Sequence, residues 1–186
     1  TRHPRSLAPA FASQRSTFAR VTGALGAAGY NLVYVDECSV CASDLSTYTW
    51  APKHHSEPAI RSADRVNLIG AYVMPRKYAF VLKRGSTKDF HVVHFFELLQ
   101  ETLADWFREG HARATVYVLD NARVHLRKRV RRYFDKKGLA VMALPPYTPE
   151  QNKVEGTFKA LKDRVRKKPL HARRMEAVVA EAIQEL

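Results

Sequence analysis

The alternation of short apolar segments with longer amphipathic ones constrains the fold of this chain more than any other feature of its sequence. Residues 11–29 predict an Ala-rich helix. Apolar runs bounded by turn residues predict strands at Leu32–Val35, Thr47–Trp50, Val66–Val73, Tyr78–Leu82, Thr115–Leu119 and Leu139–Leu144. Helical spacing predicts helices at Phe90–Phe107, at Arg123–Asp135 (ended by Gly138), after Pro149 and from His171 onward. This order indicates an α/β domain with a mixed sheet, in which three antiparallel strands precede parallel strands and helices flank the sheet.

The chain is long enough to bury one core. It has 186 residues, of which 46% are apolar, so disulfides or structural metals are not needed for stability. We predict an N-terminal helix or linker over residues 1–29 and one main domain over residues 30–186. The longest nearly unbroken apolar run, Leu68–Met74, is far shorter than the roughly 18 residues of a spanning helix, which argues against a membrane protein.

Positive charge is concentrated in two segments. Lys and Arg number 31 against 18 Asp and Glu, which gives a net charge of +13 and favours a polyanionic partner. Residues 121–137 and residues 153–174 each carry +7, so the rest of the chain is close to neutral. A solvated helix face is the alternative explanation for such runs.

Three acidic residues occupy the ends or flanks of predicted elements. Asp36 and Asp120 follow apolar strands, and Glu155 flanks the apolar stripe of the helix after Pro149. Neighbouring strands lie about 4.8 Å apart, so adjacent strands would bring both aspartates to one edge of the sheet. Carboxylates so close raise one another's pKa unless a cation is present, and Mg²⁺ prefers such oxygen ligands. Singly, an Asp after a strand is more often a turn or cap residue.

Three strings of sequence around these acids carry a specific resemblance. Val33–Glu37, Val118–His125 and Leu144–Glu155 resemble the three catalytic blocks of the mariner-type transposases, in particular their bacterial insertion-sequence branch. Thirty-four residues separate Asp120 from Glu155, a spacing typical of that family. Shorter segments between the blocks are also similar to the family, so the resemblance covers about residues 30–166.

The resemblance implies a ribonuclease-H-like fold with Asp36, Asp120 and Glu155 as catalytic and metal-binding residues for two Mg²⁺ or Mn²⁺ ions. It implies that residues 30–186 are a catalytic domain that cuts DNA at transposon ends and joins it to target DNA. The family likeness also suggests a homodimer. A bacterial cytoplasmic location at the nucleoid follows from the same likeness. The family usually has Asn-Pro-Ile-Glu where this chain has Asn152-Lys-Val-Glu155. Its helix-turn-helix modules have no room in the residues before the first strand, so we expect a fragment of a longer protein.

Several other polar residues are predicted to support this site. Phosphate contacts are predicted for Arg123, Arg127, Lys128, Arg131, Lys159, Lys162 and Arg166. We expect Asn121 to contact the metal ligands rather than the metal. His125 either contacts phosphate or orients a metal-bound water, or it is an ordinary surface histidine. Glu37 should point away from Asp36 along an extended strand and is not expected to be a primary ligand. Tyr147 is the aromatic residue predicted to contact DNA.

Two cysteines have the spacing of half a zinc site. Cys38 and Cys41 could pair with His54 and His55, but there is no second cysteine pair and the histidines are adjacent. We therefore predict ordinary packing or free thiols. For three large aromatic residues, Trp50, Tyr72 and Trp106, we predict core positions.

Three functions remain open on the sequence alone. The first is the catalytic domain of a DNA transposase, in which metal-dependent hydrolysis precedes strand transfer. The second is a nuclease of the same fold that cuts without joining. The third is a non-catalytic DNA-binding fragment. Metal binding would argue against the third, and a joining assay would separate the first two.

Overall fold

The computed structural model describes residues 9–41, 65–73, 77–107, 114–168 and 174–186 of the chain. Its helices and strands in chain order are α1 (Pro9–Ala27), β1 (Asn31–Cys41), β2 (Arg65–Val73), β3 (Lys77–Lys83), α2 (Asp89–Trp106), β4 (Thr115–Leu119), α3 (Lys128–Lys137), β5 (Ala140–Ala143), the 3-10 helix η3 (Pro149–Gln151), α4 (Lys153–Arg166) and α5 (Met175–Gln184). No helix among the described residues is long and apolar enough to cross a membrane. The strand predicted at Thr47–Trp50 lies outside the described residues.

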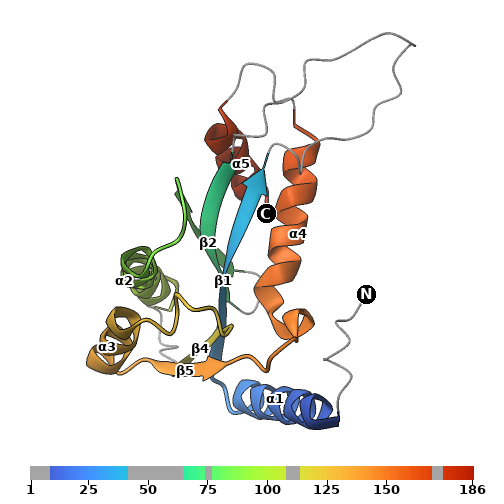
Figure 1. Cartoon of the computed structure of the whole chain (residues 1–186), viewed down its shortest axis with the longest axis vertical. Helices are drawn as coiled ribbons and strands as arrows, with labels where there is room; N and C mark the ends of the chain where they lie inside the picture. Colours follow the sequence, from blue (N-terminus) through green and yellow to red (C-terminus); the bar gives the residue numbers. More distant parts are fainter. Residues whose placement is uncertain (1–8, 42–64, 74–76, 108–113, 169–173) are drawn as a thin grey trace.

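Five strands form one mixed sheet in the order β3-β2-β1-β4-β5 (Figure 1). β1, β2 and β3 pair antiparallel, and β4 and β5 add to β1 in parallel. The crossover through α2 connects β3 to β4 and places β4 beside the first strand. The predicted arrangement of three antiparallel strands followed by parallel strands is therefore confirmed.

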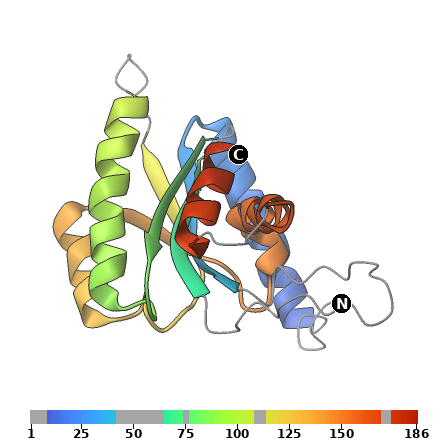
Figure 2. The ribbon, with the colours of Figure 1, turned by 90° about the horizontal axis from the view of Figure 1, so that it is seen from above.

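Helices cover both faces of the sheet (Figure 2). Side chains alternate along β1, so Val33 and Val35 pack with α2 and α3, whereas Leu32 and Tyr34 pack with α4 and α5. Phe18 of α1 is buried together with Leu32 and Tyr34, so α1 docks on the same face of the sheet as α4. The sheet therefore separates two apolar cores.

The first strand extends further than the sequence predicts. We expected Leu32–Val35 to end at Asp36, because the apolar run stops there. β1 instead continues to Cys41, since β2 pairs with it over its whole polar half as far as Cys41↔Arg65. β4 pairs with β1 only as far as Val35↔Leu119. Asp36 thus lies within a strand, at the point where its parallel neighbour ends.

The basic helix begins later than predicted. The expected helix over Arg123–Asp135 starts at Lys128, and residues 123–126 form a turn before it. One cause is the Asp120 carboxylate, which accepts a hydrogen bond from the Ala122 N–H and so favours a turn over a helix directly after β4. Gly138 ends α3 with φ +62°, as predicted.

Candidate active site

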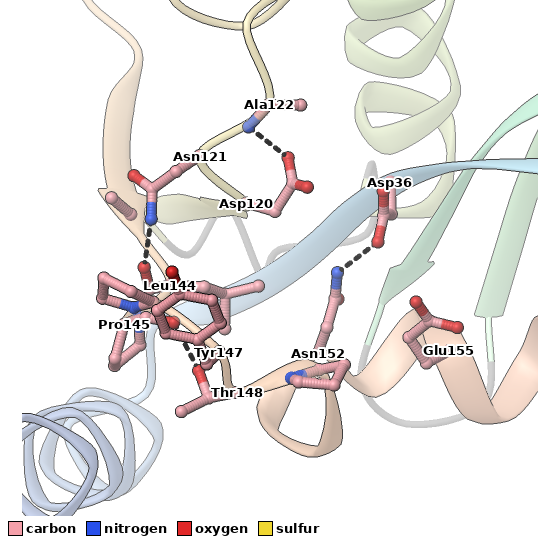
Figure 3. A pocket seen from close by; sticks show the side chains of 13 residues that line it. Asp36, Asp120, Asn121, Ala122, Leu144, Pro145, Tyr147, Thr148, Asn152 and Glu155 are labelled. Atoms are coloured by element: carbon pink, nitrogen blue, oxygen red, sulfur yellow. Dashed lines mark hydrogen bonds between the residues drawn. The ribbon is translucent and has the colours of Figure 1, made fainter. Parts of the chain in front are cut away.

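The three predicted acids line one cleft of about 670 Å³ (Figure 3). Asp36 comes from the middle of β1, Asp120 from the residue after β4, and Glu155 from the first turn of α4. The remaining wall is formed mainly by the loop between β5 and η3.

Asp36 is held by one hydrogen bond on each carboxylate oxygen. Its Oδ1 accepts from the Glu37 N–H at 2.7 Å, and its Oδ2 accepts from the Asn152 side-chain amide at 2.9 Å. Burial, followed by the negative charge of Asp120, raises the pKa of Asp36 to about 7. This value includes smaller increases from the charges of Glu37 and Glu155 and a decrease from the hydrogen bond of the Glu37 N–H. Burial and the neighbouring carboxylates thus outweigh the hydrogen bond from the Glu37 N–H, and the ionised form of Asp36 is disfavoured.

Asp120 has a different environment. Its Oδ1 accepts from the Ala122 N–H at 3.0 Å and lies 2.9 Å from Nδ1 of His125. Burial alone would raise the pKa of Asp120, but the hydrogen bonds from His125 and Ala122 and the charge of His125 outweigh burial and lower it. Asp120 is therefore held as a carboxylate beside the less acidic Asp36.

His125 joins Asp120 to Glu37. The imidazole is 4% exposed, so the alternative of a surface histidine is wrong. Its Nε2 lies 3.1 Å from Oε1 of Glu37, on the opposite ring edge from Asp120. Burial would lower the pKa of His125, but hydrogen bonds to Asp120 and Glu37 raise it to about 10. The imidazole is thus a cation at neutral pH, held between two carboxylates.

Glu37 belongs to the opposite face of the sheet from Asp36. Alternation along β1 places its side chain on the same face as Val33 and Val35, as predicted. Ligand atoms of Glu37, Asp120 and His125 lie within 4.8 Å of one another. His125 contacts one carboxylate with each ring nitrogen, so these three side chains form a hydrogen-bonded link between β1 and the turn after β4.

The other predicted residues are placed as follows. Asn121 donates its side-chain amide to the Leu144 carbonyl at 2.8 Å and lines the same cleft. Arg123 and Arg127 lie in the turns before α3, Lys128 and Arg131 in its first two turns, and all four are exposed. Lys159, Lys162 and Arg166 lie on α4, across the sheet from α3 (Figure 2), and Arg166 pairs with Asp163 at 2.7 Å.

Tyr147 lines the cleft from the loop after β5. It is 40% exposed and has φ +59°, an uncommon conformation for a residue with a bulky side chain. Its ring meets Phe11 of α1 edge to face, with the centroids 5.6 Å apart. The Thr148 hydroxyl donates to the Pro145 carbonyl at 2.6 Å and closes the loop around it.

Within the described residues, the cysteines do not form a zinc site. Cys38 and Cys41 form no disulfide, and Sγ of Cys41 accepts from Nε of Arg65 at 3.1 Å. His54, His55 and Trp50 lie outside the described residues. Tyr72 and Trp106 are partly buried and pack against the two cores, consistent with the prediction for them.

Two contributors to the site were missed from the sequence. Asn152 was noted only as part of a departure from the family string, and Glu37 was set aside because of its strand alternation. One feature of the sequence could have indicated Asn152: it is an Asn at a predicted helix start, three residues before Glu155. Its bond to Asp36 spans 116 residues, which no local pattern encodes.

Comparisons with known proteins agree with this geometry. The family profile of the DDE superfamily endonucleases matches residues 31–176. No match to a curated protein sequence was found. The Mos1 transposase paired-end complex with left transposon end is similar with a TM-score of 0.65 and 14% identity, over 92% of this chain and 52% of that chain.

Two further structures give the same fold. The Mos1 mariner paired-end complex with Mn has a TM-score of 0.64 and 13% identity, over 92% of this chain and 53% of that chain. The catalytic core domain of HTLV-2 integrase in complex with magnesium has a TM-score of 0.53 and 12% identity, over 85% of each chain. The chain spans about half the length of the Mos1 chains. These similarities confirm the predicted ribonuclease-H-like fold.

Proposed function

Because the chain belongs to the DDE superfamily of endonucleases, we propose that it is the catalytic domain of a DNA transposase. In this proposal it hydrolyses phosphodiester bonds at transposon ends and transfers the freed strand to target DNA. The observation that carries the proposal is the meeting of Asp36, Asp120 and Glu155 in one cleft, from three separate elements. We assign the chain to the bacterial insertion-sequence branch of the mariner-type enzymes on the three strings quoted above, and with it a cytoplasmic location at the nucleoid.

The donor set of the cleft fits divalent metal ions. Three carboxylates supply the oxygen ligands that Mg²⁺ and Mn²⁺ prefer. The raised pKa of Asp36 has burial as its largest cause and the negative charge of Asp120 as its second, and a bound cation would offset both. We assign Asp36, Asp120 and Glu155 as the ligands of two ions. When bound, such ions activate the attacking oxygen and stabilise the charge that develops on the phosphate and the leaving oxygen.

The protein's own groups position these ligands and the DNA. The His125 imidazolium and the Ala122 N–H fix one oxygen of Asp120, so the other oxygen is directed to the cleft. Asn121 joins the ends of β4 and β5 through the Leu144 carbonyl and so shapes the floor beside Asp120. Exposed cations, among them Arg123 and Lys159, neutralise DNA phosphates without reading sequence.

In the domain organisation we propose, residues 30–186 are the catalytic domain and residues 1–29 are an N-terminal segment whose helix α1 docks on it through Phe18. End recognition is then assigned to modules outside this chain. A homodimer on DNA is part of the same proposal.

Strand transfer distinguishes this function from its alternatives. The chain is incubated with Mn²⁺ or Mg²⁺, a supercoiled plasmid and a labelled duplex with a free 3′-hydroxyl, and both nicking and joining are measured. We expect both activities, and we expect Asp120→Asn to abolish both. Glu97→Gln, which alters an exposed acid on α2, is the matched control and should act as wild type.

The other outcomes identify the alternatives. Nicking without joining would identify a nuclease, and DNA binding without either activity would identify a non-catalytic fragment. An active Asp120→Asn protein would remove Asp120 from the proposed ligands.

A further inference from the structure

We propose that Asn152 is a positioning residue, which holds the Asp36 carboxylate in register with Glu155 and is retained there at the expense of the stability of the fold. This inference rests on the proposed function, because it assigns Asn152 a role toward the metal ligands. The evidence is a helix-cap position that makes no cap bond, a buried oxygen without a partner, and the bond to Asp36.

Asn152 occupies the boundary between η3 and α4. It is the N-cap residue of α4, has an extended backbone conformation and is 3% exposed. Asn is favoured at this position because its side-chain oxygen accepts a hydrogen bond from a backbone N–H in the first helical turn. Asn152 makes no such bond. Its side chain turns away from its own helix and toward β1 (Figure 3).

The amide nitrogen of Asn152 donates to Oδ2 of Asp36 at 2.9 Å. An ionised carboxylate only accepts hydrogen bonds, so the amide must present its nitrogen and direct Oδ1 away from Asp36. Oδ1 of Asn152 is buried, and no described residue donates a hydrogen bond to it. A buried acceptor without a partner is unfavourable. Asn152 therefore makes no hydrogen bond to the first turn of α4, and its Oδ1 has no donor among the described residues. Its one side-chain hydrogen bond to a described residue is the bond to Asp36.

That contact has a geometric consequence for the cleft. Glu155 follows Asn152 by three residues on α4, whereas Asp36 belongs to β1. The bond therefore joins the start of α4 directly to the strand and fixes Asp36 relative to Glu155. Together with the Glu37 N–H on Oδ1, it leaves Asp36 no freedom to rotate, while a second lone pair on each oxygen remains for a cation.

Gln151 supplies a matched control. Its Oε1 is also buried without a hydrogen bond from any described residue, and its amide nitrogen donates to the Arg15 carbonyl at 3.2 Å. It lies on the α1 side of η3, in a separate pocket that also contains Phe18. Replacing Gln151 thus removes a buried, unpaired side-chain oxygen of the same kind and leaves the hydrogen bond between Asn152 and Asp36 in place.

The test compares Asn152→Leu, Asn152→Ser and Gln151→Leu with wild type by thermal unfolding and by Mn²⁺ titration followed by electron paramagnetic resonance. Leu has the same branching and number of side-chain heavy atoms as Asn but no polar atoms, and Ser is a good N-cap residue too short to reach Asp36. We expect all three variants to unfold at the wild-type temperature or higher. We expect both Asn152 variants to bind Mn²⁺ about tenfold or more weakly, the usual effect of removing a residue that orients a metal ligand. Gln151→Leu should bind Mn²⁺ as wild type.

Wild type and Asp120→Asn separate this inference from the proposed function. If wild type binds no Mn²⁺, or Asp120→Asn binds it equally well, the proposed function fails and the inference with it. If Asp120→Asn loses Mn²⁺ and the Asn152 variants keep wild-type affinity, the inference alone is overturned. Marked destabilisation of both Asn152 variants would also overturn it, because Asn152 would then be needed for folding rather than for positioning.

Discussion

Asp36 is an acid that the metal-free fold does not favour in its ionised form. Burial and the charge of Asp120 raise its pKa from 3.8 to about 7, so ionisation costs stability. Such a shift corresponds to about 4 kcal/mol. The cost is absent below pH 3.8, grows as the pH rises, and is complete above pH 7.

Asp36→Asn should therefore stabilise the metal-free protein at pH 8. The variant loses one of the two hydrogen bonds accepted by Asp36, worth about 1 kcal/mol, so we expect a gain of at most about 3 kcal/mol in the free energy of unfolding. Urea unfolding in the presence of a chelator measures it. The gain should disappear by pH 4. A variant that is no more stable than wild type at pH 8 would show that Asp36 is not under electrostatic strain.

His125 has the opposite pH dependence. Its pKa in the fold, about 10, lies above the usual 6.5, so the charged imidazole stabilises the fold fully below pH 6.5, and this contribution is lost as the pH rises through 10. The Asp120 side chain is 39% exposed, which weakens the pair through solvent screening.

We expect His125→Ala to lower the free energy of unfolding by about 1–3 kcal/mol at pH 6.5, with a smaller difference near pH 10. Urea unfolding measures both values. His94→Ala, which removes an exposed histidine on α2, is the control. A nitrogen NMR spectrum of wild type at pH 8 should show a protonated His125 ring, and a neutral ring would contradict the link between Glu37 and Asp120.

At the scale of elements, Gly70 sets how closely α4 approaches the sheet. It pairs with Asp36 across β1 and β2. A Cβ atom at this position would lie 2.7 Å from Cε1 of Phe158 and 2.9 Å from Cδ1 of Phe80, closer than packing allows. Phe158 is one turn after Glu155, so this contact places the proposed ligand on α4 relative to Asp36.

Gly70→Ala should therefore displace α4 and disturb both stability and metal binding. We expect a loss of about 1–3 kcal/mol in the free energy of unfolding, the usual cost of overpacking, together with weaker Mn²⁺ binding. Adding Phe158→Leu should restore part of both. Gly156→Ala on α4 has open space around it and should not lower stability. If Gly70→Ala binds Mn²⁺ with wild-type affinity, metal binding does not depend on how closely α4 approaches the sheet.

Two basic residues of α4 share the helix face that carries Glu155. The buried residues of α4 are Val154, Thr157, Phe158, Leu161 and Val165. Lys159 and Lys162 follow Glu155 by four and seven residues, so helical spacing places them outside this stripe and on the same side of α4 as Glu155. Lys136 and Lys137, at the end of α3, precede the start of β5 and lie far from the carboxyl ends of the parallel strands.

If α4 contacts the scissile strand, Lys159→Ala with Lys162→Ala should weaken DNA binding. The slope of log K against log salt should become shallower by about 0.9 for each duplex phosphate contact that is lost. Fluorescence anisotropy over a salt series measures both quantities. Lys136→Ala with Lys137→Ala is the control with the same loss of charge, and an equal effect in the two double variants would indicate general charge attraction.

For the whole molecule, local patterns predicted the elements but not every contact between them. Periodicity and turn residues gave the order of strands and helices, because these reflect local geometry and the burial of one face. The length of β1 depended on pairing with β2, and the burial of His125 depended on Glu37, 88 residues away. The role of Asn152 likewise depended on a distant strand. The meeting of the three acids in one cleft was predictable, because the strings around them are specific.

The distribution of charge over the whole molecule predicts how it binds DNA. The chain carries +13, and its two basic segments include helices on opposite faces of the sheet, α3 on one and α4 on the other (Figure 2). Cations on exposed helices contact phosphates, and counterion release then makes the affinity fall steeply with salt.

We expect duplexes of unrelated sequence to bind this chain with affinities within about tenfold of one another, because phosphate contacts supply most of non-specific binding. The affinity should fall by about 10³-fold or more between 50 and 200 mM salt if six or more phosphates are contacted. Anisotropy titrations on a panel of duplexes at several salt concentrations test both statements. Binding that prefers one sequence strongly and changes little with salt would contradict them, because base-edge contacts from this domain would then dominate over its phosphate contacts.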